Sequence, residues 1–298
     1  MTLSKKIGAS LLLCLLIFFG FAGLYASALN ININQNELEY FSPIKDKNTS
    51  SYHSVNLYLG DKYINEKAYL INDSTYIPLR AVSTLAGASV AFDDKTRTAY
   101  ITMSGLSISI TENAYILYAN ERPILSHAPA VILSDNRMYV HVRSIAKALS
   151  LGVEWRPSRE VVLTGAVKPL VHADYYYSSD DLYWLSRIIS AESKGEPLLG
   201  QVAVGNVVLN RVRHKEYPNT IYGVIFDKKY GVQFSPVANG SIYNVPSYNS
   251  VLAAKICLEG VSLSEKILFF MEPNKSTSSW IYINRPYAFS ISNHYFFY

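Results

Sequence analysis

The chain has 298 residues, a formal net charge of +4 at pH 7 and two cysteines. This length suits two domains better than one, and so mild a charge gives no support for a nucleic-acid partner. Cys14 lies in the first apolar run, so Cys257 alone remains if that run is removed, and no intramolecular disulfide is expected.

The N-terminus has the organisation of a secretory signal. Lys5 and Lys6 precede an apolar run at residues 11–24, and Ala26-Ser27-Ala28 follows as a small-residue cleavage site. We therefore expect residues 1–28 to be a signal peptide and the mature protein to be secreted and extracytoplasmic. An uncleaved anchor is the alternative, although the run is shorter than the ~20 residues of a comfortable membrane span. Residues 29–54 are polar and rich in Asn, which favours a flexible arm.

Residues 55–168 alternate short strand patterns with single helices and contain an internal repeat. The segment TYIPLRAV at residues 75–82 returns as MYVHVRSI at residues 138–145. The turn residues Asn72-Asp73 and Asp135-Asn136 precede the two copies, and both pairs tolerate tight hairpins. Each copy therefore predicts strand, turn, strand, short helix and a final strand pair. The helices at residues 80–85 and 143–149 are too short to stand alone and must lie on a sheet, so we predict an α+β domain.

This region resembles the copper amine oxidase N-terminal-like domain. The element Tyr76-Ile77-Pro78-Leu79-Arg80 opens a helix on a small β-sheet in that family, and the second copy has His141 in place of Pro78. The resemblance implies a non-catalytic module for targeting, wall binding or spacing. His127, His141 and His172 lack metal-ligand spacing, so we expect structural roles for them and no metal or other cofactor.

Residues 169–180 are expected to be a linker between the two domains. They contain Pro169 and the run Tyr175-Tyr176-Tyr177. Two interpretations of the tyrosines remain open, because such rings either stack on sugars or pack against a neighbouring domain.

From residue 181 to residue 298 the pattern becomes helical and places an acid on an apolar stripe. Leu185, Ile188, Ile189 and Glu192 follow the spacing of one helix face. The segment Gly195-Glu196-Pro197 ends that helix, so Glu192 is expected in the last turn. Desolvation and the negative helix end both raise the pKa of a carboxyl group there, which suits a general acid. The alternative is an exposed Glu on a frayed turn.

The next helix, at residues 198–212, is apolar nearly all round and is expected to be central and buried. Gly205 in its middle predicts the close approach of another backbone, since Gly costs roughly 1 kcal/mol there relative to Ala. Asn206 and Asn210 lie four residues apart and either orient backbone or the acid, or form ordinary core hydrogen bonds. Glu196 is expected to cap this helix or to bind backbone and fix the loop.

The later loops bring together amide, hydroxyl and aromatic side chains. Aromatic rings stack on sugar faces, and amides bind hydroxyl and acetamido groups. These loops therefore indicate a carbohydrate site. Its candidate substrate-binding residues are Gln233, Phe234, Ser235, Trp280, Tyr282 and His294.

With these segments in place, residues 182–297 resemble the spore-cortex-lytic (SleB-type) cell-wall hydrolase family. The resemblance rests on residues 191–197 (AESKGEP), 200–212, 217–225, 233–240 and 293–296, together with Trp280. It implies a mainly-α, lysozyme-like fold, a peptidoglycan glycan strand as substrate, and Glu192 as the catalytic residue. It also implies lytic transglycosylation between N-acetylmuramic acid and N-acetylglucosamine, in spore germination or wall remodelling.

One departure from the family and three rival functions remain open. Glu272 stands before Pro273 where the family usually has Asn, and a second carboxylate near Glu192 would favour ordinary hydrolysis by a muramidase-type enzyme. A zinc amidase would need metal ligands, of which this half offers only His214 and His294 as histidines. A non-catalytic wall-binding protein is the third rival. A wall- or membrane-bound accessory protein is a further possible partner.

Overall fold

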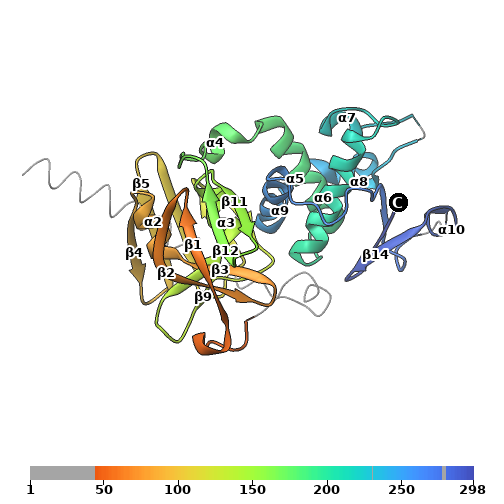
Figure 1. Ribbon diagram of the computed structural model, residues 1–298. Helices are drawn as coiled ribbons and strands as arrows, with labels where there is room; N and C mark the ends of the chain where they lie inside the picture. Colours follow the sequence, from red (N-terminus) through yellow and green to blue (C-terminus); the bar gives the residue numbers. More distant parts are fainter. Residues whose placement is uncertain (1–43, 230, 277–279) are drawn as a thin grey trace, which may run out of the picture. The chain divides into compact units, whose positions relative to one another are not determined.

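The computed structural model describes residues 44–229, 231–276 and 280–298 (Figure 1). The predicted signal peptide and the first part of the arm lie outside these residues. No helix within the described part is long and apolar enough to cross a membrane. The described residues form two compact units, of which the first contains residues 44–117 and 128–168 and the second contains residues 118–127 and 169–298. The expected division into a β-rich N-terminal part and a helical C-terminal part is confirmed.

Residues 44–168 form mainly two sheets. The larger sheet has the strand order β11-β12-β1-β2-β3-β10-β9 and the smaller one the order β4-β5-β6-β7-β8. The pairing of β1 with β12 is parallel, and the other pairings recorded between these strands are antiparallel. The elements are η1 (Thr49–Ser51), β1 (His53–Leu59), β2 (Lys62–Ile71), β3 (Ser74–Pro78), α2 (Leu79–Leu85), β4 (Ser89–Asp93), β5 (Thr98–Met103), β6 (Leu106–Thr111), β7 (Ile116–Ala119), β8 (Arg122–Leu125), β9 (Val131–Ile132), β10 (Met138–His141), α3 (Val142–Ala148), β11 (Gly152–Arg156) and β12 (Glu160–Thr164).

The two matching sequence segments have the same order of elements. Asn72 and Asp73, with φ of 46° and 59°, turn the chain between β2 and β3, and Asn136, with φ of 63°, lies between β9 and β10. Each turn is followed by a strand, a seven-residue helix and a strand pair. The final pairs differ in position, because β4-β5 belongs to the smaller sheet and β11-β12 to the larger. The two copies are therefore not equivalent parts of one sheet, and the internal repeat stays a prediction.

The C-terminal part is built around the helices α5, α6 and α9, which pack against one another (Figure 1). Helix α6 is buried from Leu198 through Arg211, as expected for a helix that is apolar nearly all round. A sheet of order β13-β15-β14 closes the chain. The elements are α4 (Ala173–Tyr176), α5 (Ser179–Ser193), α6 (Leu198–Arg213), α7 (Ile221–Ile225), α8 (Ser235–Asn239), η2 (Ser241–Tyr243), α9 (Tyr248–Leu258), β13 (Phe269–Met271), α10 (Trp280–Asn284), β14 (Tyr287–Ile291) and β15 (His294–Phe297).

Gly205 lies where three helices meet, but side chains rather than a backbone approach it. A Cβ atom at this position would lie 2.7 Å from Cys257 Sγ of α9 and 2.8 Å from Ile189 Cδ1 of α5. The expectation of a backbone contact was therefore wrong in its detail. Gly205 lets the side chains of two neighbouring helices reach the axis of α6.

We expect Gly205→Ala to destabilise the protein by about 1–3 kcal/mol, because the new methyl group overpacks this junction. The matched control is Gly195→Ala, since a Cβ atom at Gly195 meets nothing within 4 Å. Thermal unfolding of the two variants measures the difference. Equal melting temperatures would contradict the packing described for α6.

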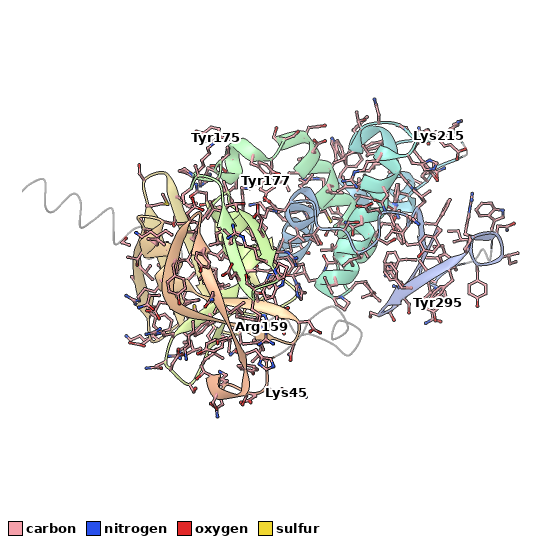
Figure 2. The ribbon with its side chains drawn as sticks, in the orientation of Figure 1. Lys45, Arg159, Tyr175, Tyr177, Lys215 and Tyr295 are labelled. Atoms are coloured by element: carbon pink, nitrogen blue, oxygen red, sulfur yellow. The ribbon has the colours of Figure 1, made fainter. Side chains whose placement is uncertain are left out.

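The expected linker is partly folded. Residues 173–176 form α4, and Tyr175 is 85% exposed whereas Tyr177 is buried (Figure 2). The Tyr177 hydroxyl donates to Glu259 Oε1 at 2.7 Å, and Arg122 pairs with the same carboxylate within the second unit. Tyr177 therefore packs within the protein, which is one of the two expected uses of these tyrosines. Tyr175 remains available to solvent.

Candidate active site

Glu192 lies in the last turn of α5, as the residue spacing predicts. Leu185, Ile188 and Ile189 of the same stripe are fully buried, and Glu192 continues the stripe at the edge of the core as a partly exposed side chain. Burial raises the pKa of Glu192 from 4.5 to about 7, and the nearby Arg211 guanidinium opposes part of this rise. No other charged side chain among the described residues contributes to the shift. A carboxyl group with this pKa can both give and take a proton at neutral pH.

Arg211 is a component of the site that the sequence analysis did not single out. It is 6% exposed on α6, and its guanidinium carbon lies 5.2 Å from the rings of Tyr217 and Phe234 and 5.5 Å from that of Phe269. The Nε group donates to the Leu268 carbonyl at 2.8 Å, whereas the buried NH1 group has no hydrogen-bond partner among the described residues. A cation held in this way favours the ionised form of Glu192. The available signal was an Arg directly after Asn210, near the end of a helix that is apolar nearly all round.

Asn206 and Asn210 bind the backbone of one loop and not the acid. Asn206 donates to the Val261 carbonyl at 2.8 Å and accepts from the Leu263 amide at 2.9 Å. Asn210 donates to the carbonyls of Ser264 and Ile267, both at 2.9 Å. Together with Arg211, these side chains fix residues 261–268, which lead into β13. Of the uses weighed for the two amides, backbone orientation within the core is the one observed.

Asn210→Ala should cost about 1–3 kcal/mol of stability, because it leaves two loop carbonyls without this donor. The exposed Asn219 provides a matched control, and its replacement by Ala should stay within about 0.5 kcal/mol. Denaturant unfolding of both variants gives the comparison. If Asn210→Ala were as stable as Asn219→Ala, the amide would contribute nothing to holding the loop.

Glu196 ties the loop after α5 to the C-terminal hairpin. Its carboxylate accepts from the Asn293 backbone amide at 3.1 Å and from the Asn293 side-chain amide at 3.0 Å, and it lies 3.5 Å from His294 Nδ1. These hydrogen bonds hold the pKa of Glu196 below its usual range even though burial opposes them. The residue at the N-terminus of α6 is Pro197, and no side chain caps that helix. Of the two roles expected for Glu196, the structure shows the second. Its carboxylate binds backbone and fixes the loop, and it does not cap α6.

Glu272 follows β13 and is already engaged. Its carboxylate forms an ion pair with Lys275 Nζ at 2.8 Å, and the pKa of Lys275 is raised by that pair. Glu272 makes no contribution to the shifted pKa of Glu192.

The candidate sugar-binding side chains fall into two groups. Phe234 and His294 are 3% exposed and pack near the Phe270 ring, at 6.4 and 5.6 Å between ring centres. The remaining four side chains reach solvent. Gln233 is partly exposed, Ser235 is exposed, and Trp280 and Tyr282 are 52% and 62% exposed. Their contact with a substrate stays a prediction.

One group of three possible metal ligands occurs among the described residues, and it does not include Glu192. Glu121, His172 and Asp174 bring ligand atoms within 4.8 Å of one another. The Nδ1 atom of His172 already accepts from the Asp174 backbone amide at 3.3 Å, which leaves that nitrogen committed to the start of α4. His214 and His294 do not belong to the group.

Comparison with known proteins assigns both parts of the chain. Residues 195–297 match the Cell Wall Hydrolase family model, and the match begins just after Glu192. This part of the chain is therefore similar to the cell wall hydrolase family. Residues 58–164 match the Copper amine oxidase N-terminal domain model. The expected resemblance of the cell wall hydrolase domain and that of the N-terminal domain are both confirmed.

The cell wall hydrolase domain is similar to spore cortex-lytic enzymes. The enzyme of Bacillus cereus is 38% identical over 120 residues, which are 40% of this chain and 45% of the relative, and that of Bacillus subtilis strain 168 is 36% identical over 120 residues, which are 40% and 38%. The chain thus spans less than half the length of the curated relatives it matches. A solved structure, the catalytic domain of the germination-specific lytic transglycosylase SleB from Bacillus anthracis, is 38% identical, with 41% of this chain and 97% of that chain covered and a TM-score of 0.38.

Proposed function

We propose that the chain is an extracytoplasmic peptidoglycan-lytic enzyme of spore germination or wall remodelling, and that Glu192 is its general acid. The observation that carries the proposal is the position of Glu192 at the end of α5, partly buried and with its pKa raised to about 7. The relatives, named as spore cortex-lytic enzymes, support peptidoglycan as the substrate and an extracytoplasmic site of action. A wall- or membrane-bound accessory protein remains a possible partner.

The proposed reaction is lytic transglycosylation. Glu192 gives its proton to the oxygen that joins N-acetylmuramic acid to N-acetylglucosamine, and the bond from the muramyl C1 to that oxygen breaks. The muramyl 6-hydroxyl oxygen then bonds to C1 and returns its proton to the Glu192 carboxylate. An anhydro ring closes without water. Arg211 stabilises the carboxylate between the two proton transfers, and Gln233, Ser235, Trp280 and Tyr282 are proposed to hold the sugars.

The second candidate function is a muramidase-type hydrolase. Such an enzyme needs one further carboxylate beside Glu192. Glu196 and Glu272 are the two carboxylates considered for that role. Glu196 is bound to Asn293 and Glu272 to Lys275, and neither contributes to the pKa of Glu192. This engagement favours the single-acid reaction.

Mass spectrometry of the muropeptides released from purified peptidoglycan tests the proposal. Anhydro-muramyl ends are expected for the transglycosylase. Reducing ends would instead establish the hydrolase, and release of free peptides that stops on chelation would establish the zinc amidase. Binding without release would leave a wall-binding protein.

A further inference from the structure

A cluster of five aromatic side chains covers one surface of the cell wall hydrolase domain and takes no part in the proposed chemistry. It consists of Tyr183, Trp184, Tyr222, Phe226 and Tyr243, and we call it the aromatic platform. Trp184 is its centre, with ring centres of the other four at 4.9, 5.4, 5.0 and 6.2 Å and all four planes steeply inclined to the indole. Tyr183, Tyr222 and Tyr243 remain 43%, 48% and 61% exposed.

The central ring of the aromatic platform is fixed by a hydrogen bond. The Trp184 indole N–H donates to Asp180 Oδ1 at 3.1 Å, which fixes the indole on α5. Tyr222 in α7 and Phe226 at its C-terminal end lie one helical turn apart, with ring centres 4.5 Å apart. Large exposed rings in a fixed arrangement lose little conformational entropy when a ligand covers them. Such a surface suits a binding site better than a patch of mobile side chains.

The aromatic platform is connected to the surroundings of Glu192 through α5 and through two further segments of the chain. Trp184 and Glu192 are eight residues apart on α5, which corresponds to about 12 Å along the helix axis. Two chain segments connect the two regions. One leads from Tyr217, whose ring contacts Arg211, to Tyr222 and Phe226, and the other leads from Phe234, which also contacts Arg211, to Tyr243.

The chemistry of the aromatic platform matches a glycan better than an apolar protein surface. Its three exposed rings are all tyrosines, and their hydroxyl groups have no hydrogen-bond partner among the described residues. A pyranose offers the complementary surface, namely an apolar face of C–H groups and a rim of hydroxyl groups. The Arg187 guanidinium lies over the Tyr183 ring, 3.6 Å from its centre, and adds N–H donors that sugar hydroxyl or acetamido oxygens can accept.

We propose that the aromatic platform is a distal binding site for the glycan strand, which holds sugars that lie beyond the scissile bond. The enzyme would then prefer long strands over short fragments. The inference rests on the proposed function for the identity of the substrate. It adds a binding surface that does not act on the reacting atoms.

The test uses Tyr222→Ala/Tyr243→Ala in the full chain that also carries Glu192→Gln, so that no cleavage disturbs the titration. Calorimetry with chitohexaose and with chitobiose, which are β-1,4-linked N-acetylglucosamine oligomers, measures binding to long and short chains. We expect about tenfold weaker binding of chitohexaose, as the loss of two ring contacts implies, and unchanged binding of chitobiose. The matched control Tyr63→Ala/Tyr298→Ala removes two other exposed tyrosines and should change neither.

Unchanged affinity for chitohexaose, or an equal loss for both oligomers, would overturn the proposal. So would a loss of binding to whole peptidoglycan alone, since that result would assign the aromatic platform to a stem peptide or a protein. Melting temperatures confirm that the variants are folded, and both replaced residues are exposed. A failure of Glu192 as the acid appears in lysis assays and not in this titration, so the two proposals fail separately.

Discussion

Glu192→Gln should abolish lysis of peptidoglycan while the protein stays folded. Gln has the size of Glu and retains the neutral polar surface of the protonated acid, but it has no proton to give. A loss of about 10²–10⁴ in rate is expected for a general acid. The assay is release of soluble muropeptides from purified peptidoglycan, at pH values from 5 to 9. Wild-type activity should also fall as pH rises above about 7, because Glu192 then becomes ionised before it can protonate the glycosidic oxygen.

The matched control is Glu216→Gln, which removes an exposed carboxylate elsewhere in the same domain. It should keep the rate and the pH profile of the wild type. Lysis by Glu192→Gln at more than a tenth of the wild-type rate would remove Glu192 from its proposed role. Loss of activity in Glu272→Gln, with anhydro-muramyl ends replaced by reducing ends in the wild-type products, would instead support a two-carboxylate hydrolase.

Glu192→Gln should also stabilise the protein at alkaline pH. The folded state holds the pKa of Glu192 near 7 against an ordinary value of 4.5. The folded protein therefore keeps a proton that the unfolded chain has lost, and stability falls as pH rises from about 4.5 to 7. The shift corresponds to about 2–3 kcal/mol, since each pKa unit is worth ~1.4 kcal/mol and solvent screens this partly exposed group. Gln carries no such cost at any pH.

We therefore expect Glu192→Gln to unfold at a higher temperature than the wild type at pH 8, by roughly 5–10 °C, and at the same temperature at pH 4. Differential scanning calorimetry at the two pH values measures this. Glu216→Gln again serves as the control and should show no pH-dependent gain. A stabilisation that is equal at pH 4 and pH 8 would show that Glu192 is not desolvated in the folded protein.

The sequence predicts the parts of the site that depend on local periodicity. The stripe Leu185, Ile188, Ile189 fixes which face of α5 is buried, and α5 ends at Ser193, so Glu192 lies in the last turn as its spacing requires. Gly195 follows the end of the helix without the positive φ of a left-handed cap. Helix α6 begins at Leu198 as expected. It is buried because apolar residues lie nearly all round it. Asn72 and Asp73 adopt positive φ in a tight turn, which is a conformation that Asn and Asp tolerate, so the sequence alone predicts it.

The contacts that the sequence did not reveal join residues far apart in the chain. Glu196 binds Asn293 rather than the helix that follows it, and nothing near Glu196 in the sequence indicates that partner. Arg211 acts on Glu192 because α6 packs beside α5, which is a property of the folded bundle. Gly205 was correctly expected to mark a close approach, but only the packing shows that the side chains of Ile189 and Cys257 make it.

The hold of α6 on residues 261–268 has a consequence for how this protein tolerates change. Asn206, Asn210 and Arg211 bind the loop through its main-chain carbonyl and amide groups, and every residue except proline carries both groups. Exposed positions such as Ser262 and Glu265 can therefore be varied widely without releasing the loop. Three side chains on α6 hold the main chain of the loop in one position. The start of β13, which follows the loop, is therefore held in the same place whatever amino acids occupy the exposed positions.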